Sequence, residues 1–381
     1  MKIIVVDPGK NEVKSFCFSN NGTLEYVNSF PSKSNEIIEE RFLEEDSSLR
    51  QYRMELNGHS YMVGEGVDTT YNTELTKNSL HHKLCIYATV ADFLTEEDHD
   101  EEVLLVLGYP STDFQNNFRR EDYQRLIYGD KDGHIEFVQN GKEVSFQLTN
   151  VIVLPEGQAM LPRMTEVEDY YSLYVLDIGG QNVNFREFDN KGNAKTAFSI
   201  DAAGVNYLET TLEAELRRAI ENPNVNFRGI DYNEAILTGK IFDIGAIEGF
   251  SDSTAFINSV VQNFIKKEIV SELASRGYNI NVHGQHIIFT GGGSLLLQPY
   301  LENLLQGNKS NLIFSKSAKW DNCLSYTIKA FQEQFTTNEQ FTSFIKPLYT
   351  ELMKNGYANF YKGLTPSATP DDDTMDFNRV L

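Results

Sequence analysis

The strongest constraint on the fold is a short pattern that the sequence repeats at two distant places. The apolar run IIVV (3–6) ends in the turn DPG (7–9), and the apolar run LYVL (173–176) ends in DIG (177–179). Three positions match between the two stretches: Asp7, Gly9 and Val13 align with Asp177, Gly179 and Val183. Continuous apolar runs of this kind are typical of strands covered on both faces, and Asp, Pro and Gly end them in turns. The repeat therefore predicts a fold that is duplicated between the two halves of the chain.

The composition is that of a globular protein and excludes several kinds of partner. The chain has 381 residues, enough for two ordinary domains, and a net charge of -22. This charge argues against direct binding to a nucleic-acid backbone, so a connection with nucleic acid would run through a basic partner. Cys17, Cys85 and Cys323 lack disulfide-framework and metal-ligand spacing. No segment approaches roughly 18 apolar residues and the N-terminus is unlike a signal peptide, so we expect no membrane contact and a cytoplasmic location.

Turn signals and periodicity predict the elements of a first module. A hairpin is expected through NNG (20–22), a helix over 76–94 and a buried strand over 101–111. The stretch 144–161 is expected to contain strands, a Pro-Glu turn and the start of a helix. His81 and His82 have no carboxylate or cysteine at ligand spacing, so they are interpreted as a polar helix face and not as a metal site.

A second module repeats the strand and hairpin, with the second turn at NKG (190–192). Helices are expected over 205–221 and 256–277, and a strand, a triple-glycine turn and a helix over 286–305. The pattern of 322–361 is helical and rich in aromatic residues, whereas the acidic stretch 365–376 is expected to be disordered. Four aromatic residues of this helical region are expected to lie in a core: Phe331, Phe335, Phe341 and Phe344.

The repeated turns suggest a site for a phosphorylated ligand and a metal ion. Glycine lets backbone amides approach an anion closely, whereas aspartate suits a hard cation such as Mg²⁺, which bridges one or two carboxylates to phosphate oxygens. Lys10 or Lys14 could supply further positive charge. The triple glycine 291–293 would let a purine or ribose lie against bare backbone. Each motif alone also fits an ordinary turn or a tight helix entry, but the set of three favours a nucleotide site.

These three stretches resemble the phosphate-one, phosphate-two and adenosine motifs of the actin, sugar kinase and heat-shock chaperone ATPase superfamily. More narrowly, the chain resembles the bacterial actin-like ParM family of plasmid segregation, because DPGKNEVK, LPEGQA, LDIGGQNVN, AAGVNYLETTL and FTGGG follow that family's order over about residues 1–335. The resemblance implies an α/β fold of actin-like, duplicated ribonuclease-H-like domains with an interdomain nucleotide cleft. Domain I would comprise 1–165 plus 320–361 and domain II 166–319, followed by a disordered acidic tail over 362–381.

The resemblance also implies roles for individual residues. Asp7 and Asp177 would hold hydrated Mg²⁺, Asp177 and Glu156 would be the catalytic residues, and Glu156 would position or activate the attacking water. Lys14 matches a phosphate-contacting lysine. The implied nucleotide contacts are Asp7, Gly9, Lys10, Asn11, Lys14, Gly179, Gly180, Gln181, Asn182, Gly204, Gly291, Gly292 and Gly293. Without the resemblance, Glu156 would be interpreted as a solvated turn carboxylate, the commonest state of Glu.

The chain departs from the family pattern after its second turn. Gln181 and Asn182 replace frequent threonines, and their amides still donate hydrogen bonds. Asn184 replaces a frequent acidic residue, so no metal role is expected there.

The function implied by the resemblance is that of a filament-forming ATPase. It would use ATP or GTP with Mg²⁺, associate with itself head to tail, and segregate plasmid DNA through a basic DNA-binding adaptor protein. The alternative is a soluble small-molecule kinase or chaperone-type ATPase of the same superfamily, since fold alone does not separate them. The chain is short for most sugar kinases and has no obvious peptide-binding β-domain after its core, which favours the filament.

Overall fold

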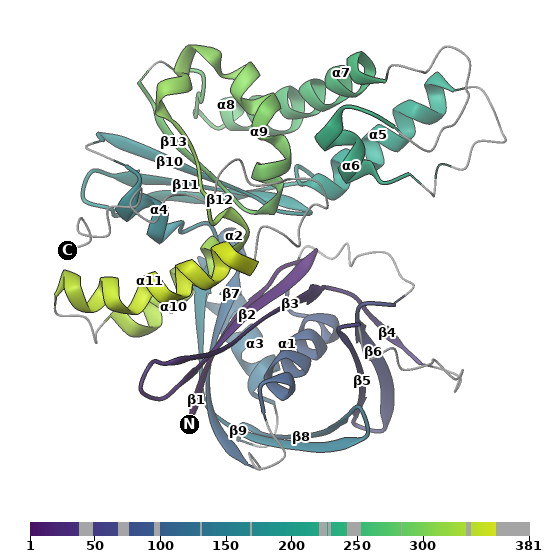
Figure 1. The fold of residues 1–381 in the computed structure, drawn as a ribbon, viewed down its shortest axis with the longest axis vertical. Helices are drawn as coiled ribbons and strands as arrows, with labels where there is room; N and C mark the ends of the chain where they lie inside the picture. The colour runs from purple at the N-terminus through teal and green to yellow at the C-terminus, as the bar shows by residue number, and fades with distance from the viewer. Residues whose placement is uncertain are drawn as a thin grey trace. The chain divides into compact units, whose positions relative to one another are not determined.

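The computed structural model describes residues 1–37, 49–67, 76–94, 100–129, 132–167, 170–220, 227, 230–241, 253–282, 284–332 and 337–355. The chain divides into two compact units (Figure 1). Unit 1 consists of Met1–Met160 and Asn322–Leu348, and unit 2 of Leu161–Asp321 and Tyr349–Leu381. The acidic stretch 365–376 lies outside the described residues.

Unit 1 contains a curved mixed sheet. Its strands are β1 (Lys2–Pro8), β2 (Glu12–Ser19), β3 (Leu24–Pro31), β4 (Ser34–Glu36), β5 (Gln51–Leu56), β6 (His59–Gly64), β7 (Glu101–Tyr109), β8 (His134–Gln139) and β9 (Lys142–Pro155). Among the described residues, the order across the sheet is β3-β2-β1-β7-β9-β8-β5-β6-β4. The pairs β1–β7 and β7–β9 are parallel, and β1–β2 and β2–β3 are antiparallel hairpins. The expected turn at 20–22 is confirmed between β2 and β3, with Gly22 at φ 84°.

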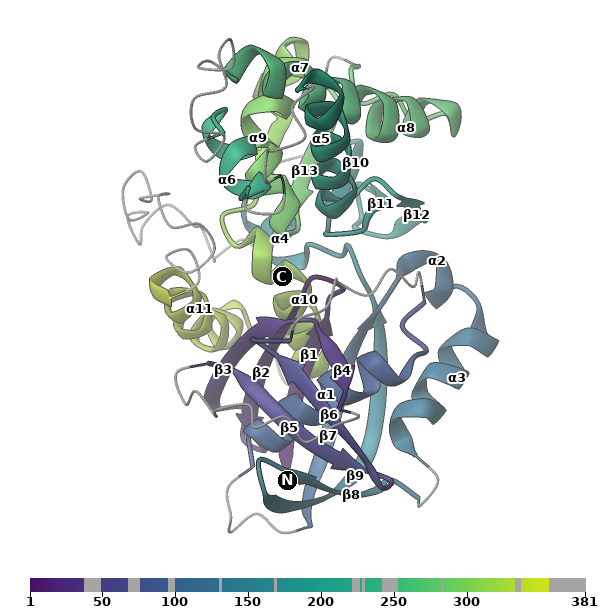
Figure 2. The same ribbon diagram turned by 90° about the vertical axis from the view of Figure 1, so that its right-hand side faces the viewer.

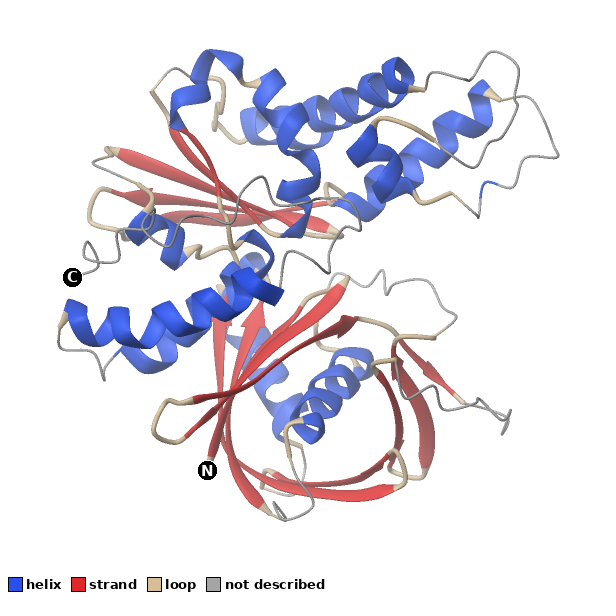
Figure 3. Cartoon of the chain, viewed as in Figure 1, coloured by secondary structure: helices blue, strands red, loops and turns tan. Residues whose placement is uncertain are grey.

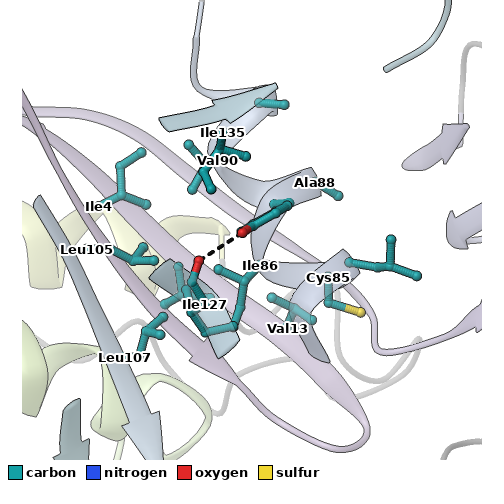
Figure 4. Packing of buried hydrophobic residues seen from close by; sticks show 14 of the residues in the cluster. Ile4, Val13, Cys85, Ile86, Ala88, Val90, Leu105, Leu107, Ile127 and Ile135 are labelled. Carbon is teal, nitrogen blue, oxygen red and sulfur yellow. Dashed lines mark hydrogen bonds between the residues drawn. The ribbon is translucent and has the colours of Figure 1, made fainter. Parts of the chain in front are cut away.

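The helix α1 (Leu80–Asp92) lies in the hollow of this sheet, which curls around it (Figure 3). Ser79 caps its start by accepting a hydrogen bond from the backbone N–H of His82. Most of α1 is buried, and Ile86, Ala88 and Val90 pack among sheet residues such as Ile4 (Figure 4). A helix covered on several sides has little polar face, so the interpretation of His82 as part of one is wrong: its side chain is fully buried.

Unit 1 also contains α2 (Ser111–Phe114), α3 (Asn117–Tyr128), all but the first residue of α10 (Asp321–Phe331) and the first part of α11 (Asn338–Asn355). Of the four aromatic residues expected in a core, Phe331 and Phe341 are buried, Phe344 is half-buried, and Phe335 lies outside the described residues. The ring of Phe331 lies 5.2 Å from that of Phe18 on β2 and 4.9 Å from that of Phe344. Close contact with α10 also explains Gly108 on β7, because a Cβ there would collide with the Tyr326 ring.

Unit 2 repeats the opening of unit 1. Its strands are β10 (Ser172–Ile178), β11 (Asn182–Asp189), β12 (Ala194–Asp201), β13 (His286–Thr290) and β14 (Leu312–Phe314). Among the described residues, they form a sheet in the order β12-β11-β10-β13-β14. The two antiparallel hairpins and the parallel β10–β13 pair match β3-β2-β1-β7 of unit 1, which confirms the duplication predicted from the repeated pattern.

The helices of unit 2 are α4 (Met160–Thr165), α5 (Val205–Ala219), α6 (Tyr232–Thr238), α7 (Thr254–Phe264), α8 (Ser271–Ser275) and α9 (Gly292–Leu304). Helices α5, α7 and α9 lie close together (Figure 2) and bury Leu208, Val261 and Leu297 in one core with the sheet. The helix expected over 256–277 contains a π-helical turn at Ile265–Val270 between α7 and α8. No helix of the described ranges is both long and apolar enough to cross a membrane.

Candidate functional site

The first repeated turn joins β1 to β2 and is closed by backbone contacts. The Gly9 N–H donates to the Asp7 carbonyl at 2.8 Å, and a Cβ on Gly9 would lie 2.5 Å from the Glu12 carbonyl oxygen. Glycine is therefore the residue that fits this turn. In the β1–β2 register, Asp7 stands opposite Lys14.

The Asp7 carboxylate is buried among positive charges. Lys14 Nζ lies 3.1 Å from Oδ2 and Lys77 Nζ lies 3.9 Å from Oδ1, and the Asn322 side chain also hydrogen-bonds to the carboxylate. Burial by itself raises the pKa of Asp7, but the two ammonium groups and the hydrogen bonds outweigh it and leave this pKa below its usual value. Burial by itself lowers the pKa of Lys14, yet Asp7 and Glu12 raise it above its usual value. The pair is therefore charged at neutral pH.

Glu156 lies in the same cluster of charges. It follows β9, its N–H donates to the Tyr109 carbonyl at 3.0 Å, and only 6% of its surface is exposed. Its Oε1 accepts a hydrogen bond from Lys77 Nζ, the ammonium group that also faces Asp7. The next residue is held too, because the Gly157 N–H donates to Asn322 Oδ1 at 3.0 Å. A solvated turn carboxylate is thus the wrong interpretation of Glu156.

Lys77 is the functional candidate that the sequence analysis missed. Its side chain is 1% exposed and connects Asp7 with Glu156. The other candidates of this turn behave differently from one another: Lys10 is buried, whereas Asn11 is half-buried and its Oδ1 atom is enclosed without a hydrogen-bond partner. An enclosed acceptor of this kind would suit a donor brought by a ligand or its bound water.

The second repeated turn joins β10 to β11 in the same register, with other side chains. The Gly179 N–H donates to the Asn182 carbonyl at 3.0 Å, and Asp177 stands opposite Asn184. Asn184 Oδ1 accepts from Ser199 Oγ at 2.7 Å. Where unit 1 places an ammonium group, unit 2 places a neutral amide.

The turn of unit 2 is tied to the start of α5. The carbonyls of Gly179, Gly180 and Gln181 accept from three N–H groups at that helix end at 3.1, 2.7 and 3.2 Å, respectively. A Cβ on Gly204, the N-cap residue, would collide with the Gly180 backbone. These bonds satisfy donors that a helix start otherwise leaves open and fix the backbone of the turn.

The triple glycine lies against the same turn. Gly291 has φ 79°, and a Cβ there would collide with Asp177 Oδ1 and with the Ile178 carbonyl. A Cβ on Gly293 would lie 2.6 Å from the Val205 side chain. Gly292 and Gly293 belong to α9, so the expected turn is limited to Gly291. Unit 2 therefore brings Asp177, the Gly179–Gln181 turn, Gly204 and the triple glycine together.

The carboxylates of the two repeated turns are of the chemical kind that a hydrated magnesium ion takes as ligands. No group of three or more His, Cys, Asp or Glu side chains placed for a metal ion occurs in the described part of the chain. Mg²⁺ needs only one or two carboxylates when phosphate oxygens and waters complete its shell. Asp7 and Asp177 are both buried carboxylates at glycine turns, 3% and 4% exposed, which suits that mode.

Comparisons with known proteins agree with this architecture. Residues 6–158 match the family model described as actin like proteins N terminal domain. A search of curated proteins gave no match. Among solved structures, the Alp12 filament structure is 23% identical with a TM-score of 0.57 and covers 88% of this chain and 99% of its own. Ta0583, an archaeal actin homolog, is 16% identical with a TM-score of 0.63 and covers 87% and 100%. A pCBH ParM non-polymerisable quadruple mutant is 14% identical with a TM-score of 0.61 and covers 88% and 99%.

These matches extend over almost all of each similar structure and over both units of this chain. The chain therefore has the actin fold, built from duplicated α/β domains. The resemblance to actin-like proteins found in the sequence is confirmed at the level of the fold.

Proposed function

We propose that this chain is an actin-like ATPase that assembles into filaments under the control of its bound nucleotide. The observation that carries this proposal is the duplicated turn with a buried aspartate, Asp7 in unit 1 and Asp177 in unit 2, with Glu156 buried beside the first. Two structurally similar proteins are described as filaments, Alp12 and AlfA from B. subtilis plasmid pLS32, and another as a complex with ADP. These descriptions support the proposal by similarity of fold.

Each residue of the two turns has its own role in the proposed phosphoryl transfer. The Gly9 turn, Lys10, Asn11 and Lys14 bind phosphate groups from unit 1, and Lys14 is already charged beside Asp7. Glu156 accepts a hydrogen bond from the attacking water and orients it, since positioning and charge stabilisation dominate this reaction. Asp7 and Asp177 would hold a hydrated Mg²⁺ ion, which would neutralise phosphate charge.

Unit 2 contributes the remaining contacts. The turn of Gly179, Gly180, Gln181 and Asn182 binds phosphate groups through backbone and amide donors. The ribose and the purine base, adenine for ATP or guanine for GTP, lie against the backbone of Gly204 and the triple glycine. Binding and hydrolysis of the nucleotide change how strongly one subunit binds the next.

The assembly is an open head-to-tail filament in the cytoplasm, because a heterologous contact that does not close generates a helix. A net charge of -22 makes subunits repel one another, so salt or divalent cations strengthen the polymer by screening. The same charge suits a basic DNA-binding adaptor protein as the link to plasmid DNA.

Sedimentation tests this proposal. The chain is mixed with Mg-ATP, Mg-GTP, Mg-ADP or no nucleotide across a salt series, and pelleted protein and released phosphate are followed over time. We expect polymer with a triphosphate that shrinks after hydrolysis, and Glu156→Gln polymer that persists because hydrolysis slows by about 100-fold. A chain that binds and hydrolyses nucleotide but stays monomeric at every salt concentration would favour the soluble kinase or chaperone-type alternative.

A further inference from the structure

Lys77 is a buried cation with two carboxylates around it. Its ammonium group donates to Glu156 Oε1 and lies 3.9 Å from Asp7 Oδ1, and 1% of the side chain is exposed. Burying an ammonium group is costly unless it is paired, and removing one partner of a buried pair leaves the other uncompensated. The fold therefore buries the Lys77 ammonium group between Asp7 and Glu156 despite the cost of removing this charge from water.

The two carboxylates next to the Lys77 ammonium group, Asp7 and Glu156, both have roles in the proposed function. In the proposed function, Asp7 would hold hydrated Mg²⁺ and Glu156 would orient the attacking water. The group that must lie between metal and attacking water is the terminal phosphate. The Lys77 ammonium lies between these same two carboxylates.

The charges around Lys77 allow it to change partner. Lys14 also pairs with Asp7, so Asp7 keeps an ammonium neighbour when Lys77 turns away. His82 on α1 interacts electrostatically with Lys77. Burial, reinforced by His81, Lys77 and Lys10, lowers the pKa of His82 well below the usual value, so it adds no competing positive charge at neutral pH. The long, unbranched lysine stem carries three donors and reorients easily.

We propose that the Lys77 ammonium binds the terminal phosphate of the triphosphate and pairs with Glu156 when that phosphate is absent, so that Lys77 distinguishes triphosphate from diphosphate. This inference rests on the proposed function. In the triphosphate state Glu156 is released to the water, and after phosphate departs Lys77 returns to Glu156. The exchange couples the presence of the terminal phosphate to the state of the catalytic carboxylate.

A comparison of four variants separates this role from a structural one. Dissociation constants for a non-hydrolysable ATP analogue and for ADP are measured on the full chain, with Mg²⁺ and with EDTA, in Glu156→Gln, Lys77→Met, the double variant and Lys77→Arg. The double variant removes both charges of the buried pair, so it remains informative if Lys77→Met alone fails to fold. Lys83→Met, on the helix α1 that begins three residues after Lys77, is the control, since the Lys83 ammonium group lies 5.2 Å from the centre of the Tyr87 ring.

Relative to Glu156→Gln, we expect the double variant to lose about 10- to 100-fold in affinity for the ATP analogue and less than about threefold for ADP, the scale of one charge-assisted contact. Lys77→Arg keeps the charge and should restore part of the preference for triphosphate. Equal losses of affinity for the ATP analogue and for ADP, or no loss, would overturn the proposed role of Lys77 but leave the proposed function standing. A wild-type chain that binds neither nucleotide would overturn the proposed function as well.

Discussion

The two repeated turns share a backbone and differ in charge. Asp7 and Asp177 occupy the same position in matching hairpins, and each is followed two residues later by a glycine. The residue opposite the aspartate is Lys14 in unit 1 and Asn184 in unit 2. Unit 1 thus surrounds its aspartate with ammonium groups, whereas unit 2 packs glycine backbone against its aspartate at Gly291. The two turns thus share their backbone geometry, while the side chains and backbone packed against the aspartate differ between the units.

The largest effect should come from the residue opposite each aspartate. Lys14→Met removes one partner of a buried ion pair, so we expect the free energy of unfolding to fall by about 2–4 kcal/mol. Asn184→Ala removes a neutral hydrogen bond with Ser199, and we expect a loss of about 1 kcal/mol. Chemical denaturation of both variants gives the comparison. Equal losses in the free energy of unfolding would mean that the charge difference between the hairpins does not contribute to stability.

A second prediction uses the opposite pH responses of two buried carboxylates. The pKa of Asp7 is below its usual value, so its contribution to stability is present above about pH 4 and is lost on acidification. Burial, assisted by Asp321 against a smaller opposing effect of Lys316, raises the pKa of Glu166 in unit 2 from 4.5 to about 8. Glu166 therefore contributes most below about pH 4.5, and this contribution is lost as the pH rises towards 8.

We expect Glu166→Gln to flatten the pH dependence of unfolding between about pH 5 and 8 and to raise stability at pH 8 by about 2 kcal/mol. The free energy of unfolding is measured across this range by denaturant titration. Glu213→Gln is the control, because Glu213 pairs with Arg217 on the exposed side of α5. Parallel curves for wild type and Glu166→Gln would show that Glu166 ionises as an ordinary solvated carboxylate.

The sequence predicted the parts of this comparison that depend on local pattern. The apolar runs and turn residues around Asp7 and Asp177 gave the strands, the hairpins and the duplication, because strand burial and turn chemistry are written in adjacent residues. The register opposite each aspartate then follows from the hairpin itself. The roles of these residues in binding metal and nucleotide remain predictions.

The charge network of unit 1 could not be predicted in this way. Lys77 is 79 residues from Glu156 along the chain, and no spacing in the sequence connects them. His82 was misjudged for a related reason, since an amphipathic interpretation assumes a solvent face that α1 loses inside the curled sheet. Gly204 was included through its motif, but the packing of the Gly180 backbone against it appears only in the fold.

The smallest and most local prediction concerns the matching glycines of the two turns. A Cβ on Gly9 would lie 2.5 Å from the Glu12 carbonyl oxygen, whereas a Cβ on Gly179 would lie 3.3 Å from the Asn182 carbonyl oxygen. The first contact forces the backbone to move, and the second asks for a shift of a few tenths of an ångström. We therefore expect Gly9→Ala to destabilise the chain by about 1 kcal/mol more than Gly179→Ala, within the usual range for overpacking. Thermal unfolding of both variants, with and without ADP, measures the difference. If Gly179→Ala lowered the stability more than Gly9→Ala, the turn of unit 2 would be the tighter one. The difference between the two hairpins would then lie in the charge of their side chains alone.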